Sequence, residues 1–144
     1  MPDEPRILPD VVGSPAAPAP REPGAPTGRP LRLTVRGVLS GADILAYVQI
    51  AAASDWLSQP LVVDARQATF DPSNEEVWRL VMAVEQLSRT ICLGRTALIT
   101  GGDLEYGVAR MYSIMAAHCH PGFRVFRRLD EAKLWVSDEH ADVS

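Results

Sequence analysis

The sequence has few of the features on which secreted, disulfide-stabilised and membrane-spanning proteins depend. It contains two cysteines, Cys92 and Cys119, which lie far apart and outside any Cys-x-x-Cys motif. Isolated cysteines are typical of a reducing compartment, so we expect a cytoplasmic protein rather than a disulfide scaffold. No apolar run reaches the roughly 18 residues of a transmembrane helix, and no charged start precedes a shorter apolar run. The sequence therefore predicts neither a signal peptide nor stable membrane insertion.

An excess of basic residues is also missing. Between Leu31 and Val136, eleven Lys or Arg residues balance eleven Asp or Glu residues, so the formal charge of −4 comes from the two ends of the chain. Proteins that bind nucleic acids need a basic surface to neutralise phosphates. Nucleic acid is therefore not an expected partner.

The common catalytic and cofactor-binding motifs are absent. There is no G-x-G-x-x-G or G-x-x-x-x-G-K-[ST] loop and no G-x-S-x-G turn. His118, Cys119 and His120 are consecutive at the end of a predicted helix, so their side chains point in different directions and do not have metal-site spacing. We expect no cofactor, no metal and no enzymatic activity.

The prolines divide the chain into a domain and its ends. Nine of the twelve prolines lie in residues 1–30, a segment without apolar periodicity, which predicts a disordered Pro/Ala-rich tail. Residues 137–144 form an acidic C-terminal fringe. The folded domain is expected over residues 31–136.

Strands and helices alternate along this domain. Strands are predicted at Leu31–Gly37, Leu61–Ala65, Arg95–Thr100 and Phe123–Arg127. Four helices are predicted. The first follows Ser40, and the second begins at Ser73 with capping-box spacing. The third begins at Asp103, which is expected to be its cap, and the fourth covers Asp130–Val136. The inner face of the third helix is expected to contain Leu104, Gly107, Val108, Met111 and Met115. This order predicts an α/β fold, with a small, mostly parallel sheet of four to five strands and four helices.

In such a sheet a ligand is expected beyond the carboxyl ends of the strands. Candidate ligand-binding or interaction residues at this edge are Asp64, Asp71, Ser73, Thr100, Tyr106 and Arg110. Simpler interpretations exist for each type of residue: Asp64 forms a local hydrogen bond, Asp71 forms a turn before Pro72, and Tyr106 and Arg110 belong to an ordinary amphipathic helix.

The closing segments of the domain resemble a known family. YGVARMY (Tyr106–Tyr112) and FRVFRRLDEAKLWV (Phe123–Val136) are similar to the ending of SpoIIAA-like, or STAS/SEC14-type, bacterial domains, and the likeness extends back through RTALIT and LVVDARQATFDPS. The resemblance implies a small α/β fold related to anti-sigma-factor antagonists, with no enzymatic activity established for the group. It implies a regulatory protein–protein interaction first, and a small-molecule or lipid ligand, as in SEC14-like modules, as the alternative. An enzyme acting at the carboxyl edge of the sheet is the third choice. The family commonly begins with a hairpin strand before Leu31, where this chain has its Pro-rich segment.

Ser73 has two interpretations. In the antagonists that the chain resembles, a serine at about this place is phosphorylated, and a phosphate at a helix start would meet free N–H groups. Glu75 and Glu76 would repel that phosphate, and a serine followed by Glu three residues later is also a capping box. The cap is the favoured interpretation.

Trp78 and Met82 lie one helical turn apart and off the main apolar face of their helix. An exposed pair of this kind predicts a homodimer contact. The expected partners are therefore a protein or a small apolar ligand.

Overall fold

A computed structural model describes residues 11–12 and 30–137. The strands are β1 (Val11–Val12), β2 (Leu31–Leu39), β3 (Leu61–Phe70), β4 (Thr96–Thr100) and β5 (Phe123–Phe126). The helices are α1 (Gly41–Ala53), α2 (Asn74–Ser88), α3 (Asp103–Met115) and α4 (Leu129–Ser137). The predicted tail and acidic fringe lie almost wholly outside the described residues.

The strands form one sheet in the order β1-β2-β3-β4-β5. Strands β2 to β5 are parallel to one another, and β1 pairs antiparallel with β2. The predicted fold class, a mostly parallel α/β sheet with four helices, is confirmed. The two-residue strand β1 falls inside the range predicted as a disordered tail, where it supplies an edge strand before Leu31.

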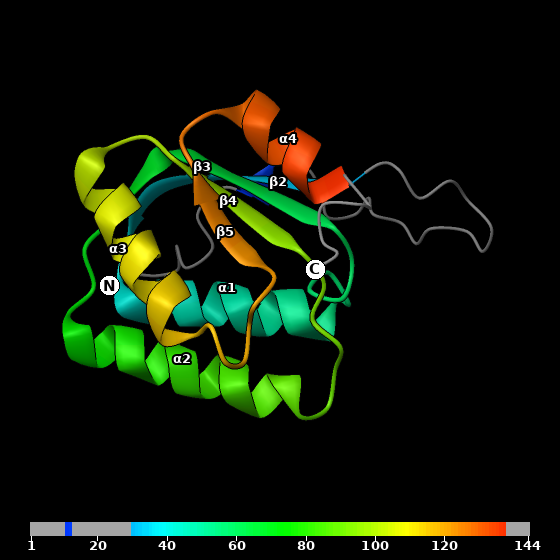
Figure 1. Ribbon diagram of the computed structural model, residues 1–144. Coiled ribbons are helices and arrows are strands. Elements are labelled where there is room, and N and C mark those ends of the chain that lie inside the picture. Colours follow the sequence, from blue (N-terminus) through cyan, green and yellow to red (C-terminus); the bar gives the residue numbers. More distant parts are fainter. Residues whose placement is uncertain (1–10, 13–29, 138–144) are drawn as a thin grey trace.

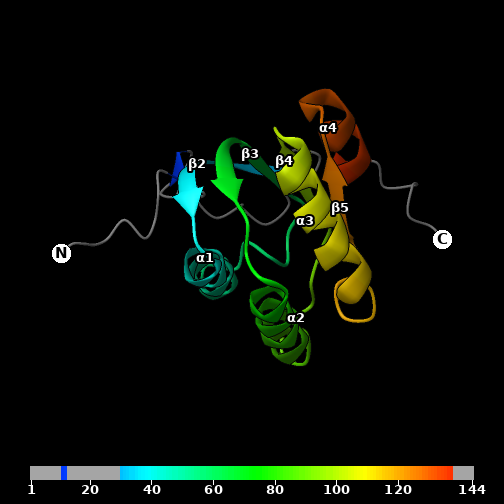
Figure 2. The same ribbon diagram turned by 90° about the vertical axis from the view of Figure 1, so that its left-hand side faces the viewer.

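The helices cover the two faces of the sheet unequally. Helices α1, α2 and α3 lie on one face and α4 lies alone on the other (Figures 1 and 2). On the α4 side, Ala132 and Val136 pack against Val62, Ala97 and Ile99 of the central strands. On the opposite side the buried residues form three separate clusters between the sheet and the three helices.

Helices α1 and α2 begin with complete capping boxes, as predicted for α2. The Ser40 and Ser73 hydroxyls accept hydrogen bonds from the N–H groups of Asp43 and Glu76, each at 3.1 Å. The carboxylates of Asp43 and Glu76 accept bonds from the serine N–H groups in return. These bonds satisfy helix-end donors that otherwise lack partners.

Helix α3 differs from the prediction at its start. Its N-cap is Gly102, with no side-chain cap, so the prediction that Asp103 caps the helix is wrong. Asp103 is already the first helical residue, and its carboxylate forms an exposed ion pair with Arg127 at 2.9 Å.

The predicted inner face of α3 is also wrong in part, since Leu104 is 54% exposed and Gly107 is exposed. The fully buried positions are Glu105, Ala109 and Tyr112. Their spacing of four and three residues still marks one helical face. That face is rotated from the predicted one because small Ala109 allows close packing and Tyr112 fills the space beside His120 and Phe123.

Candidate functional site: an apolar cavity between the sheet and three helices

A cavity of about 190 Å³ lies between the sheet and helices α1, α2 and α3. Its walls include Val35 and Leu98 from the sheet, Tyr47 from α1, Leu80 from α2 and Val108 from α3. The cavity is neither fully enclosed nor flat. An engineered cavity of about 150 Å³ with similar lining binds benzene. This volume therefore suits a molecule of about seven or eight non-hydrogen atoms.

The surface that faces the cavity is entirely apolar, and no charged side chain lines it. These apolar residues reach the cavity because side chains alternate along each strand. The same face of the sheet receives Leu33 and Val35 of β2, and Leu61, Val63 and Ala65 of β3. Such a surface binds hydrocarbon groups through burial of apolar area and dispersion contacts. It offers an ionised group nothing to pair with.

Tyr112 and His120 contribute to the wall at the amino end of the sheet. The Tyr112 hydroxyl lies 2.9 Å from His120 Nδ1, and Phe123 packs edge-on against Tyr112. Burial lowers the pKa of His120 to about 4 and raises the pKa of Tyr112. Both groups are therefore neutral at physiological pH.

Three buried polar atoms have no hydrogen-bond partner within the described residues: Thr96 Oγ1, Thr100 Oγ1 and His120 Nε2. Thr96 and His120 line the cavity, whereas Thr100 does not. Buried polar groups are rarely left unpaired, because each one costs about 1–3 kcal/mol. Two of the three exceptions are thus residues of the cavity wall.

The cavity is not where the sequence places a site. None of the six candidate residues lines it, and the tyrosine of α3 in its wall is Tyr112, not Tyr106. A cavity is space left between residues that lie far apart in the sequence, so no local sequence pattern predicts it.

Asp64 lies within β3 and not at its end. The strand continues to Phe70 because β2 runs alongside it, and β3 carries one extra residue between the pairs Thr34–Asp64 and Arg36–Gln67. Alternation from Val62 puts Asp64 on the α4 side of the sheet, away from the cavity. Its carboxylate accepts bonds from Arg66 Nε at 2.9 Å and Nη2 at 2.7 Å, and the side-chain bond to Arg66 lowers its pKa. This supports the local hydrogen-bonding interpretation.

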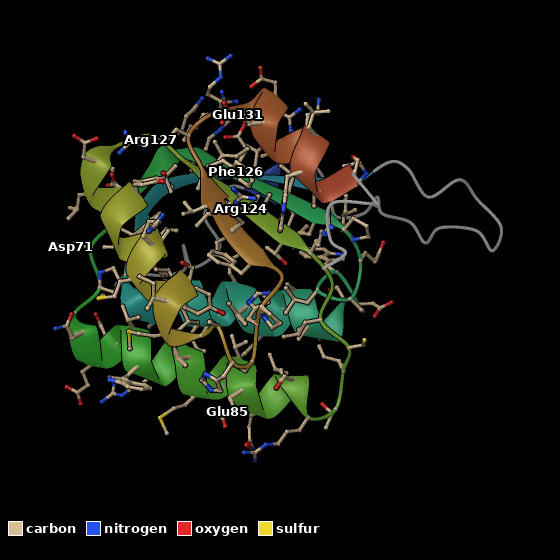
Figure 3. All side chains as sticks on the ribbon, viewed as in Figure 1. Asp71, Glu85, Arg124, Phe126, Arg127 and Glu131 are labelled. Carbon is tan, nitrogen blue, oxygen red and sulfur yellow. The ribbon has the colours of Figure 1, made fainter. Side chains whose placement is uncertain are left out.

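The remaining candidates are spread along the carboxyl edge. Thr100 is buried at the end of β4. The guanidinium carbon of Arg127 lies 4.3 Å from the centre of the Tyr106 ring. Arg110 is exposed one turn further along α3. Figure 3 shows Arg127 beside the start of α3 and Asp71 below it, in the connection between β3 and α2.

The structure places Ser73 at the N-cap of α2, where its hydroxyl accepts the bond from Glu76. The predicted capping box is confirmed. Phosphorylation of Ser73 stays a prediction.

The described residues contain no group of three or more His, Cys, Asp or Glu side chains arranged to hold a metal ion. None of their helices combines the length and the apolar character of a membrane span.

Comparison with known proteins adds one structural likeness. No protein-family model and no curated relative matches the sequence. A solved structure of an uncharacterised DUF3478-family protein from Shewanella loihica PV-4, described with a SpoIIAA-like fold, is similar at a TM-score of 0.42 and 19% identity. The match covers 73% of this chain and 82% of that one.

Proposed function

We propose that this protein is a non-catalytic module that binds a small, mainly apolar molecule between its sheet and helices α1, α2 and α3. The observation that carries the proposal is the apolar cavity of about 190 Å³. Ligand pockets are typically concave and mostly apolar, and they are largely formed before binding. The volume limits the buried part of the ligand to about seven or eight non-hydrogen atoms. A longer acyl chain would leave part of its length outside.

The absence of charge in the wall supports binding over catalysis. Acid–base and nucleophilic catalysis need ionisable groups held against the reacting atoms. The only ionisable groups among the lining residues are Tyr47, Tyr112 and His120, and burial keeps the last two neutral.

The proposal is tested by filling the cavity. Ala51 of α1 is buried in the wall, so Ala51→Leu would occupy part of the volume. Ala53→Leu adds the same side chain at an exposed position of the same helix and is the matched control. Toluene should raise the melting temperature of the wild type and of Ala53→Leu, because a ligand that binds only the native state stabilises it. The shift should largely disappear in Ala51→Leu. No shift in the wild type at near-saturating toluene would refute the proposal.

Native mass spectrometry of protein purified from its own host complements this test. A retained small molecule, lost on denaturation and absent from Ala51→Leu, would identify the natural ligand. The same spectrum reports the oligomeric state.

A second function, contact with a protein partner, is supported by α2. Trp78 is 51% exposed and Met82 is 59% exposed, one turn apart on this helix. Large exposed apolar side chains that adjoin one another mark interaction surfaces. If the contact is a homodimer, Trp78→Glu should halve the native mass. If the wild type and Trp78→Glu both have the mass of a monomer, the homodimer is rejected.

A further inference from the structure

Two arginines share one carboxylate on the side of the sheet that α4 covers only in part. Helix α4 packs on β3, β4 and β5, and Figure 2 shows it at the β5 side of the sheet, away from β2. Arg32 of β2 and Arg66 of β3 contact Asp64 there, with their Nη2 atoms 3.5 and 2.7 Å from Oδ2. The arginine side chains are 45% and 42% exposed, whereas the Asp64 side chain is 8% exposed. Two guanidinium groups thus lie at the surface above a buried carboxylate.

The two guanidinium groups are close enough to bind one anion together. Since both Nη2 atoms contact the same oxygen, they are at most about 6 Å apart. Two oxygens of a single phosphate group, each about 2.8 Å from a nitrogen, can bridge that gap. Arg66 directs only its Nε and Nη2 atoms to Asp64, and Arg32 directs only Nη2. The described residues supply no acceptor for the other N–H groups of the two side chains, which therefore remain available to a ligand.

Asp64 positions the arginines and leaves little carboxylate surface to repel a ligand. Its Oδ1 atom accepts hydrogen bonds from Arg66 N at 3.2 Å and Arg66 Nε at 2.9 Å, and its Oδ2 atom accepts from both Nη2 groups. The bonds from Nε and Nη2 to different carboxylate oxygens form a fork that fixes the plane of the Arg66 guanidinium. A side chain that is fixed before binding loses less conformational entropy when the ligand arrives.

We propose that Arg32 and Arg66 bind a phosphate group, as free phosphate or as a phosphate monoester. Guanidinium forks match the oxygens of phosphate in geometry and charge. Arg36 follows on the same side of β2 and forms no ion pair with a described residue, so three positive charges accompany the single negative charge of Asp64. This excess complements a phosphate monoester, which carries about two negative charges at pH 7. The site lies on the opposite side of the sheet from the apolar cavity and is independent of the proposed function.

Calorimetric titration of the full chain with inorganic phosphate at low ionic strength tests the proposal. The main variant is Arg32→Gln, because Asp64 keeps its closer bonds to Arg66 and the fold should be retained. Arg32→Lys keeps the charge and removes the planar fork. Arg79→Gln is the matched control: Arg79 is also exposed and pairs with one carboxylate, that of Glu75 at 3.2 Å, but it lies on α2.

Arg32→Gln should weaken phosphate binding about five- to tenfold, since a charge-assisted hydrogen bond is lost. Arg32→Lys should recover only part of the lost affinity, because an ammonium group cannot bind two oxygens side by side. Arg79→Gln should stay within about twofold of the wild type, since salt screens distant charges. In the wild type, phosphate should also shift the NMR signals of the Nε–H groups of Arg32 and Arg66 but not that of Arg79. This second measurement needs no variant.

Vesicles distinguish the two sources of the phosphate group. Co-sedimentation with phosphatidylcholine vesicles that contain phosphatidate, lost in Arg32→Gln, would assign the site to a lipid headgroup. Binding of inorganic phosphate without co-sedimentation would assign it to a soluble phosphate.

Three results would overturn the proposal. Equal weakening by Arg32→Gln and Arg79→Gln would reduce the effect to net charge and refute the site. Acetate binding as tight as phosphate binding would refute the assignment to phosphate. So would the absence of phosphate binding by the wild type at millimolar concentrations. None of these results bears on toluene binding, so the proposed function is tested separately.

Discussion

The two faces of the same sheet are packed in different ways. On the α4 face, Ala97 and Ala132 have no exposed surface where one short helix packs on the central strands. On the other face, three helices cover the sheet and still leave about 190 Å³ between them. Small residues bring α4 close to the strands, whereas the large side chains of the opposite layer meet without filling the centre.

Native interiors are usually packed as densely as organic crystals, so a void of this size requires a reason. An unfilled apolar cavity costs free energy in proportion to its volume. Over the central strands, by contrast, Ala97 and Ala132 bring α4 against the sheet with no exposed surface. We therefore interpret the looser face as the functional one, and three predictions test the contrast.

The largest expected effect concerns His120, which belongs to the cavity face. Its native pKa of about 4 lies below the ordinary value of 6.5, so between these two values the unfolded chain binds a proton that the native protein does not. Stability is full above pH 6.5 and falls as the pH drops toward 4, by about 3 kcal/mol in total. Urea unfolding at a series of pH values measures this loss.

His120→Phe should remove most of the pH dependence in that window. The substitution removes the buried imidazole and leaves the exposed His118, which lies 3.8 Å from Glu85, in place. Asp64, whose pKa is lowered below 3.8, contributes only at lower pH. A wild-type stability that is flat from pH 6.5 to 4 would mean that His120 is not buried as described.

A pair of equal substitutions compares the faces directly. Ala132→Leu adds a large side chain to the closed face and should cost about 1–3 kcal/mol, since overpacking forces the surrounding residues apart. Ala51→Leu adds the same atoms to the cavity and should be neutral or should stabilise by up to about 1 kcal/mol. Equal destabilisation by both substitutions would contradict the difference between the faces.

Which features of the fold the sequence predicts depends on whether they are local along the chain. Helix starts such as Ser73 with Glu76 and strand alternation such as Leu33 with Val35 are local patterns, and they give the correct order of elements. The polar run after Asp64 resembles a loop, yet it forms the second half of β3 because β2 lies beside it. That pairing is non-local, and so is the cavity, whose walls combine strands and helices from Leu33 to Phe123. The candidate edge residues follow from topology alone, which does not specify how side chains fill the space between layers.

The smallest predicted effect concerns the capping boxes of the helices over the cavity. Ser73→Ala should cost about 1 kcal/mol, because the N–H of Glu76 loses its acceptor, and Ser40→Ala should cost about the same at α1. Ser73→Asp should be near the wild type in stability, since aspartate also caps helices well. Thermal unfolding of the three variants measures these differences.

If Ser73 is only a cap, Ser73→Asp should also bind the same partners and the same apolar ligands as the wild type. A change in partner binding for Ser73→Asp, with Ser40→Asp unchanged, would instead support a phosphorylation switch at the start of α2.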